Sequence, residues 1–161
     1  MFTGALAASY YGTPRTTMDI DIVAEVARKE SRARLIFALK IVGLKVDRRR
    51  IDAALRSSYR IVTFRDTKTP LTVDIILSSR KLEKRTGSIL GLPTFYQTAK
   101  DLILAKLRMI KATVPRERAL KDEDDVKAIL RHTRVQMKAL RKQARKSNTI
   151  LILEAIAPSD H

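Results

Sequence analysis

Hydrophobic and polar residues alternate along three stretches of the first half of the chain, which predicts a small β-sheet. Residues 19–24 (DIDIVA) place polar and apolar side chains in alternation, and residues two apart in a strand point to the same face. Two later runs, YRIVTFRD at 59–66 and LTVDIILSS at 71–79, are rich in β-branched residues. Because only the short segment TKTP separates these two runs, we expect them to form a hairpin.

The rest of the chain is dominated by apolar residues at helical spacing. Residues 29–44 repeat apolar side chains every three or four positions and include Gly43, which is a helix stop signal. Residues 80–94 have the character of a loop around a glycine turn, and the apolar tail at 149–157 reads as a docking strand or a helix end. Helices are expected at residues 2–11, 29–44, 48–58, 95–112 and 116–146.

These elements predict an α+β fold with a small mixed or antiparallel sheet, flanked by helices and followed by a helical C-terminal half. Residues 1–79 are expected to form the α/β core, and residues 80–161 to pack on the same core as one compact unit. A chain of 161 residues is long enough for one domain of this kind.

The charge balance points to polyanionic partners. Lys and Arg number 33 against 17 Asp and Glu, a formal net charge of +16, and such an excess favours nucleic acid or nucleotide phosphates. The alternative is a highly charged solvated surface, as in a thermophile, although thermophiles usually balance the two signs. The chain has no cysteine, no apolar run of roughly 18 residues that could span a bilayer, and no leader pattern, so we expect a cytoplasmic protein without membrane contact.

Three aspartates interrupt apolar strands and suggest a metal site. Asp19 and Asp21 would lie on one face of the first strand, and adjacent carboxylates repel one another unless a cation or a proton intervenes. Asp74 interrupts the run TVDIIL in the same way. If the two strands are neighbours, the three carboxylates can hold Mg²⁺ or Mn²⁺, which prefer oxygen ligands. The alternative is that the Asp-x-Asp pair faces solvent and that Asp74 is a charge that protects an edge strand.

The segment TGALAASYYGTPRTTMDIDIV resembles the signature of the nucleotidyltransferase superfamily that includes DNA polymerase beta and the minimal nucleotidyltransferases. The family pattern has Gly followed by Gly or Ser, then Asp-x-Asp after a helix, and a third Asp on a later strand. In this chain Gly4 and Ala5 match the first element, Asp19 and Asp21 the second, and Asp74 the third. The departures are Ala5, which has no hydroxyl for the phosphates, and a start only three residues before Gly4.

The helical half is similar to the branch that contains abortive-infection-type nucleotidyltransferase toxins. DLILAKL and RALKDEDDV are similar to its "K-L" and "R-x-x-K-D-x-x-D" elements. The matching residues are Lys106, Arg118, Lys121, Asp122 and Asp125.

The resemblance, which runs from about residue 3 to residue 130, implies roles for these positions. The three aspartates would be catalytic and would bind the metal. Gly4 would let the backbone approach a triphosphate, Arg15 would fork onto a phosphate, and Lys106 would either contact a phosphate or be an ordinary solvated lysine. Nucleotide binding is thus expected at Gly4, Ala5, Arg15, Thr17, Lys106 and Arg118.

The implied function is Mg²⁺-dependent transfer of a nucleoside monophosphate from an NTP to a hydroxyl acceptor. The charge favours RNA, such as a tRNA end, as the acceptor, and a protein hydroxyl comes second. The basic stretch 131–146 would follow a phosphate backbone or bind an acidic partner of a toxin–antitoxin pair. Formation of a homodimer is a further expectation. The rivals are a catalytically weak module that binds nucleic acid or a partner protein, and a metal-independent protein whose acids are surface residues.

Overall fold

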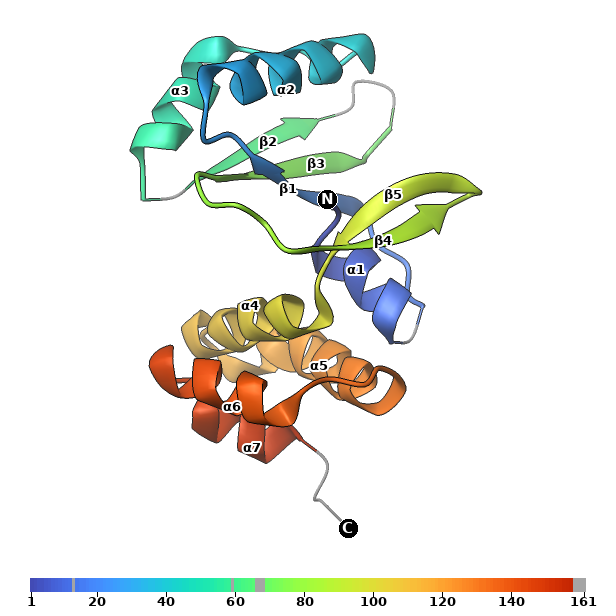
Figure 1. Cartoon of the computed structure of the whole chain (residues 1–161), viewed down its shortest axis with the longest axis vertical. Helices are drawn as coiled ribbons and strands as arrows, with labels where there is room; N and C mark the ends of the chain where they lie inside the picture. Colours follow the sequence, from blue (N-terminus) through green and yellow to red (C-terminus); the bar gives the residue numbers. More distant parts are fainter. Residues whose placement is uncertain (13, 59, 66–68, 158–161) are drawn as a thin grey trace. The chain divides into compact units, whose positions relative to one another are not determined.

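The computed structural model describes residues 1–12, 14–58, 60–65 and 69–157 and divides the chain into two units. The first unit comprises Met1–Leu6 and Thr16–Gln97, and the second comprises Ala7–Arg15 and the residues from Thr98 onward. The first unit contains a mixed three-stranded sheet and a hairpin, and the second is helical (Figure 1). The predicted α+β class, with a largely helical C-terminal half, is therefore confirmed.

The sheet consists of β1 (Asp19–Glu25), β2 (Ile61–Arg65) and β3 (Thr72–Ser78), in the order β1-β3-β2. Strands β2 and β3 form the predicted antiparallel hairpin, and β1 pairs with β3 in parallel. Parallel neighbours need a long crossover connection, and the chain between β1 and β3 provides it with two helices and β2. The central position of β3 brings Asp74 next to the strand that carries Asp19 and Asp21.

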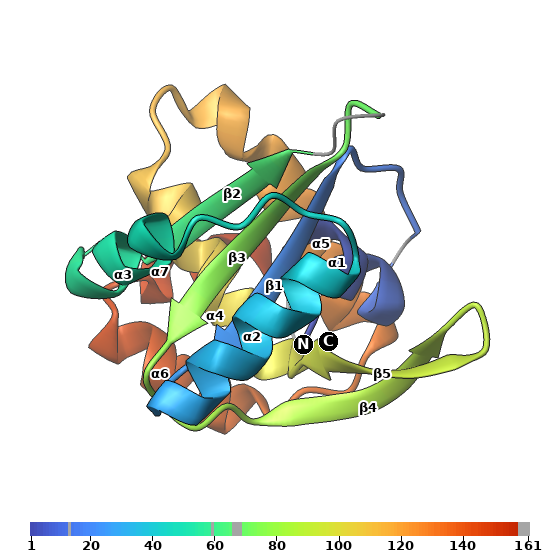
Figure 2. The same cartoon turned by 90° about the horizontal axis from the view of Figure 1, so that it is seen from above.

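Helices α2 (Lys29–Ile41) and α3 (Arg48–Arg56) cover one face of this sheet (Figures 1 and 2). Helix α2 ends where expected, because Gly43 adopts a φ of 83° that L-residues rarely take. The buried cluster between helices and sheet contains Val26, Ile36, Leu39, Ile51, Ala54, Val62, Phe64, Ile75 and Leu77. Since Ile75 points into this cluster, its neighbour Asp74 points to the opposite face.

A second hairpin, β4 (Lys84–Ile89) and β5 (Leu92–Gln97), replaces the loop expected at residues 80–94, so that prediction is wrong. The turn residues Leu90 and Gly91 have φ values of 50° and 79°, the two positive angles of a tight hairpin turn. Phe2 forms bridges to both Ile22 of β1 and Tyr96 of β5. Burial and the positive charge of Lys84 lower the pKa of the Met1 amino group, which donates to the Val23 carbonyl.

The second unit is built around α4 (Ala99–Ala112), which contacts each of the three helices that follow the 3₁₀ helix Arg116–Ala119. Those helices are α5 (Leu120–His132), α6 (Met137–Lys146) and α7 (Ile150–Ile156). The apolar tail is therefore a helix rather than a strand. Helix α1 (Gly4–Tyr11) begins in the first unit, and its residues from Ala7 onward belong to the second. The largest fully buried side chains here are Leu102, Ile103, Leu107, Val126, Ile129, Leu140, Leu153 and Thr149.

The boundary between the units falls after Gln97, whereas the sequence pattern suggested a boundary after residue 79. The second hairpin belongs with the sheet because Phe2 accepts from Gln97 and donates to Phe95 through backbone groups. No helix within the described ranges is long and apolar enough to cross a membrane.

Candidate nucleotide and metal site

The face of the sheet opposite α2 and α3 carries two polar rows that run across the strands. In the first row, Asp21 of β1 is the direct register partner of Asp74 of β3, which in turn faces Thr63 of β2. Register partners point to the same face and have neighbouring Cβ atoms. Asp21 and Asp74 therefore lie next to each other, as the metal hypothesis requires.

The second row begins with Asp19, two residues before Asp21 on the same face of β1. Asp19 is paired in register with Thr72 of β3, and Thr72 with Arg65 of β2. The three aspartates therefore lie on the same face of two neighbouring strands. Asp19 is exposed, whereas Asp21 and Asp74 are half-buried.

Two threonine hydroxyls hold two of the three carboxylates. Thr72 Oγ1 donates to Asp19 Oδ1, and Thr63 Oγ1 donates to Asp74 Oδ1 at 2.5 Å. Thr63 lies on β2, which flanks β3 on the side opposite β1, so Asp74 is hydrogen-bonded to the strand that does not carry Asp21. In this arrangement no three acidic or histidine side chains within the described part of the chain are grouped closely enough to hold a metal ion.

The donor set nevertheless fits a hard divalent cation. Carboxylate oxygens are the ligands that Mg²⁺ and Mn²⁺ prefer. Three carboxylate groups lie on one face of two neighbouring strands. Asp19, Asp21 and Asp74 would hold the ion. In the absence of a cation the same placement is unfavourable, because like charges that face each other across strands repel.

Gly4 is packed directly against Asp21. Its φ is 56°, and a Cβ atom added to it would lie 1.9 Å from Asp21 Oδ2. The Thr3 amide also donates to the Asp21 carbonyl oxygen at 3.0 Å. The sequence interpretation gave Gly4 a role at the triphosphate, whereas the structure gives it a nearer one: it leaves room for the Asp21 carboxylate at the start of α1.

Replacing Gly4 with alanine is expected to lower the free energy of unfolding by about 2 kcal/mol, the combined effect of a left-handed backbone and the overlap with Asp21. Gly43→Ala is a matched control, because Gly43 has a φ of 83° but no atom within 4 Å of an added Cβ. Urea denaturation should show a clearly smaller loss for Gly43→Ala. Equal losses for the two variants would mean that the contact with Asp21 contributes nothing.

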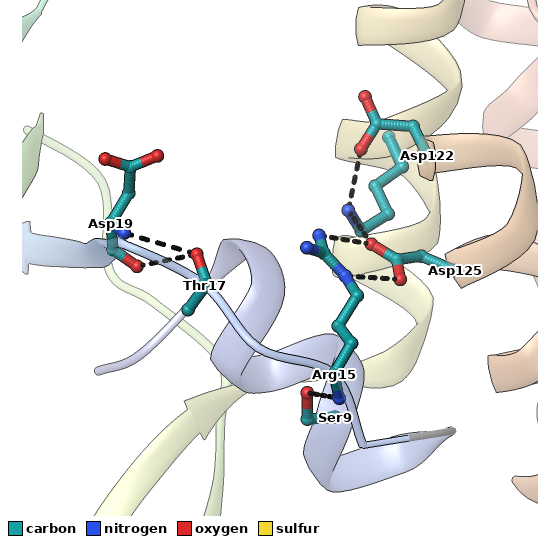
Figure 3. Close-up of polar contacts among 7 residues, drawn as sticks. Ser9, Arg15, Thr17, Asp19, Asp122 and Asp125 are labelled. Carbon is teal, nitrogen blue, oxygen red and sulfur yellow. Dashed lines mark hydrogen bonds and ion pairs between the residues drawn. The ribbon is translucent and has the colours of Figure 1, made fainter. Parts of the chain in front are cut away.

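Ala5 and Thr17 support the same region of the first unit. The Ala5 side chain is buried, so it contributes to packing. The Thr17 hydroxyl bonds to the backbone amide and carbonyl of Asp19, both at 3.2 Å, and thereby fixes the chain where β1 begins (Figure 3). The Thr17 side chain thus contacts β1, the strand that carries Asp19 and Asp21.

Arg15 and Lys106 belong to the second unit, where both cations bind carboxylates. The Arg15 guanidinium donates two hydrogen bonds to the Asp125 carboxylate, with Nε–Oδ1 and Nη2–Oδ2 distances of 3.0 Å (Figure 3). Lys106 Nζ lies 2.8 Å from Asp122 Oδ1 and 2.7 Å from Asp125 Oδ2. The Lys106 and Asp125 side chains are only 6% and 7% exposed, so Lys106 is not a solvated lysine.

This network explains why the chain carries charges at those positions. A buried ammonium is stable only when it is paired and hydrogen-bonded, and two carboxylates surround this one. Asp125 bridges Lys106 and Arg15, so one carboxylate neutralises two cations. Arg118 lies exposed in the 3₁₀ helix that precedes α5.

Sequence reasoning missed Thr63, Thr72 and Arg65 as members of the polar face. The alternation that identified Asp74 would also have identified Thr72, because the two residues are two apart in one strand. Thr63 and Arg65 could be found only once the register between β2 and β3 was known. No protein-family model matches the chain, and no curated protein matches it.

Proposed function

We propose that the protein is a Mg²⁺-dependent nucleotidyltransferase that moves a nucleoside monophosphate from an NTP to a hydroxyl acceptor. The observation that carries the proposal is the direct register of Asp21 with Asp74, with Asp19 two residues away on the same face of the sheet. Three carboxylates lie close together on the face of the sheet opposite α2 and α3. This placement favours a bound cation over a packing role.

In the proposed reaction the acceptor hydroxyl oxygen attacks the α-phosphorus of the NTP. The bond from that phosphorus to the oxygen bridging to the β-phosphate breaks, and pyrophosphate leaves. Asp74, one of the two half-buried carboxylates, would receive the hydroxyl proton, while Asp19 and Asp21 would hold the cation beside the phosphates. The divalent cation, when bound, neutralises the charge that develops on the phosphate oxygens.

RNA is the acceptor that the surface charge favours. Helix α6 contains five basic residues and no acidic one. Lys138, Lys142 and Arg145 are exposed at helical spacing, so they share one face that can follow a phosphate backbone. The same face favours the second candidate function, a module that binds RNA, or an acidic antitoxin-like partner, without catalysis.

Metal removal is the direct test of the proposed activity. The whole chain, incubated with Mg²⁺, total RNA and each α-labelled NTP in turn, is expected to transfer label to RNA and to release pyrophosphate. Excess EDTA should stop both signals, and added Mg²⁺ should restore them. Binding of RNA with neither label transfer nor pyrophosphate release from any NTP would contradict the enzyme and support the binding module.

A further inference from the structure

Two of the three cations expected to bind the NTP phosphates, Arg15 and Lys106, already have carboxylate partners in the second unit. Arg15 is held by Asp125 in a bidentate pair, and Lys106 lies buried between Asp122 and Asp125. Releasing either cation to bind a phosphate would leave a buried carboxylate with fewer partners, which is strongly unfavourable. A cation on the polar face itself is a better candidate.

Arg65 occupies such a position. It ends the second polar row, Asp19–Thr72–Arg65, on the face that also carries Asp21 and Asp74. Two strand spacings of roughly 4.8 Å place its Cα about 10 Å from that of Asp19. An arginine side chain can span most of that distance, so its guanidinium reaches phosphates held beside the Asp19 carboxylate.

The guanidinium of Arg65 is available for this contact. Arg65 is exposed, and no acidic side chain within the described part of the chain forms an ion pair with it. Asp19, the acid in its own row, bonds instead to Thr72. A planar guanidinium matches two phosphate oxygens at once, which makes arginine the preferred residue for phosphate recognition.

We propose that Arg65 binds the triphosphate of the incoming NTP and so sets the affinity of the site for triphosphates over monophosphates. This inference rests on the proposed nucleotidyltransferase function. The three aspartates would hold the cation and the phosphates beside it, and Arg65 contacts the remaining negative oxygens from the opposite edge of the sheet. Arg65 is thus a binding residue, and it leaves the metal ligands untouched.

The test measures binding of inorganic tripolyphosphate in the presence of Mg²⁺ by calorimetry, followed by each NTP and its NMP. Arg65→Ala is expected to weaken tripolyphosphate and NTP binding about 10- to 100-fold, the effect of losing a charge-assisted hydrogen-bonded pair. Binding of NMP and of Mn²⁺ alone should stay within about twofold of the unmodified chain. Arg65→Lys should restore part of the affinity, because it restores the charge without the fork.

Arg56→Ala is the matched control, because Arg56 is an exposed arginine on α3, which covers the other face of the sheet. It should leave every affinity unchanged. Unchanged tripolyphosphate binding in Arg65→Ala would overturn the role of Arg65 while leaving the proposed function intact, as would an equal loss in Arg56→Ala. If the unmodified chain binds neither tripolyphosphate nor any NTP, the proposed function fails and the role of Arg65 fails with it. Retained Mn²⁺ binding shows that a variant is folded at the site.

Discussion

Replacing Asp21 with asparagine is expected to lower the rate of nucleotidyl transfer about a thousandfold while leaving the metal-free fold as stable as before or slightly more stable. Asparagine keeps the shape that Gly4 accommodates and removes one of three negative charges. Loss of a metal ligand removes several kcal/mol of transition-state stabilisation, and each 1.36 kcal/mol is a factor of ten in rate. Label transfer to RNA measures this effect directly.

The stability of the same variant separates a functional role from a structural one. Asp21 faces Asp74 in direct register, and such like-charged pairs destabilise a sheet by about 0.2–1 kcal/mol. In EDTA, Asp21→Asn should therefore unfold at the same or a higher urea concentration than the unmodified chain. In Mg²⁺ the order should reverse, because the ion stabilises only the protein that binds it. A lower stability of Asp21→Asn in EDTA would identify Asp21 as a structural residue instead.

Asp125→Ala should lower the free energy of unfolding by about 3 kcal/mol. The Lys106 side chain is only 6% exposed, and the substitution leaves it with Asp122 as its one carboxylate partner in this network. Arg15 loses its bidentate partner. Breaking a buried ion pair from one side typically costs about 3–5 kcal/mol, and the partial exposure of Arg15 places this case at the lower end. Urea denaturation followed by circular dichroism measures the loss.

The neighbouring residue is a matched control for this prediction. Asp124 precedes Asp125 on α5 but is 77% exposed, and its contact with Lys127 is long, at 3.8 Å. Exposed pairs of this kind contribute little, so Asp124→Ala should change the free energy of unfolding by at most about 0.5 kcal/mol. Similar losses in both variants would show that general charge on α5, rather than the buried network, stabilises the second unit.

Local pattern predicted the elements of the first unit well and their pairing only in part. The strands around Asp21 and Asp74 follow from alternation, and the β2–β3 hairpin from the short segment between its runs. The parallel pairing of β1 with β3 depends on how α2 and α3 pack over the sheet, which no short window of sequence records. The sequence could therefore propose that the three aspartates meet, but it could not give the register.

Two errors have clear physical reasons. The hairpin turn at Leu90 and Gly91 lacks the Asn-Gly or Asp-Gly pair that usually signals such turns, and β4 is polar on both faces, so the segment resembles a loop. The sequence alone favours a surface or phosphate-binding lysine at Lys106, because a buried charge is rare. Only its two carboxylate partners, 16 and 19 residues further along the chain, make its burial possible.

The division of the chain into units has a practical consequence for dissecting it. Neither unit is a single uninterrupted piece of polypeptide, because Ala7–Arg15 is grouped with the helices although it precedes the sheet in the chain. Cutting between Gln97 and Thr98 would leave Arg15 on the wrong fragment and take from Asp125 its guanidinium partner. Separately produced halves should therefore be poor substitutes for the intact protein, and a helical fragment would need residues 7–15 grafted onto it.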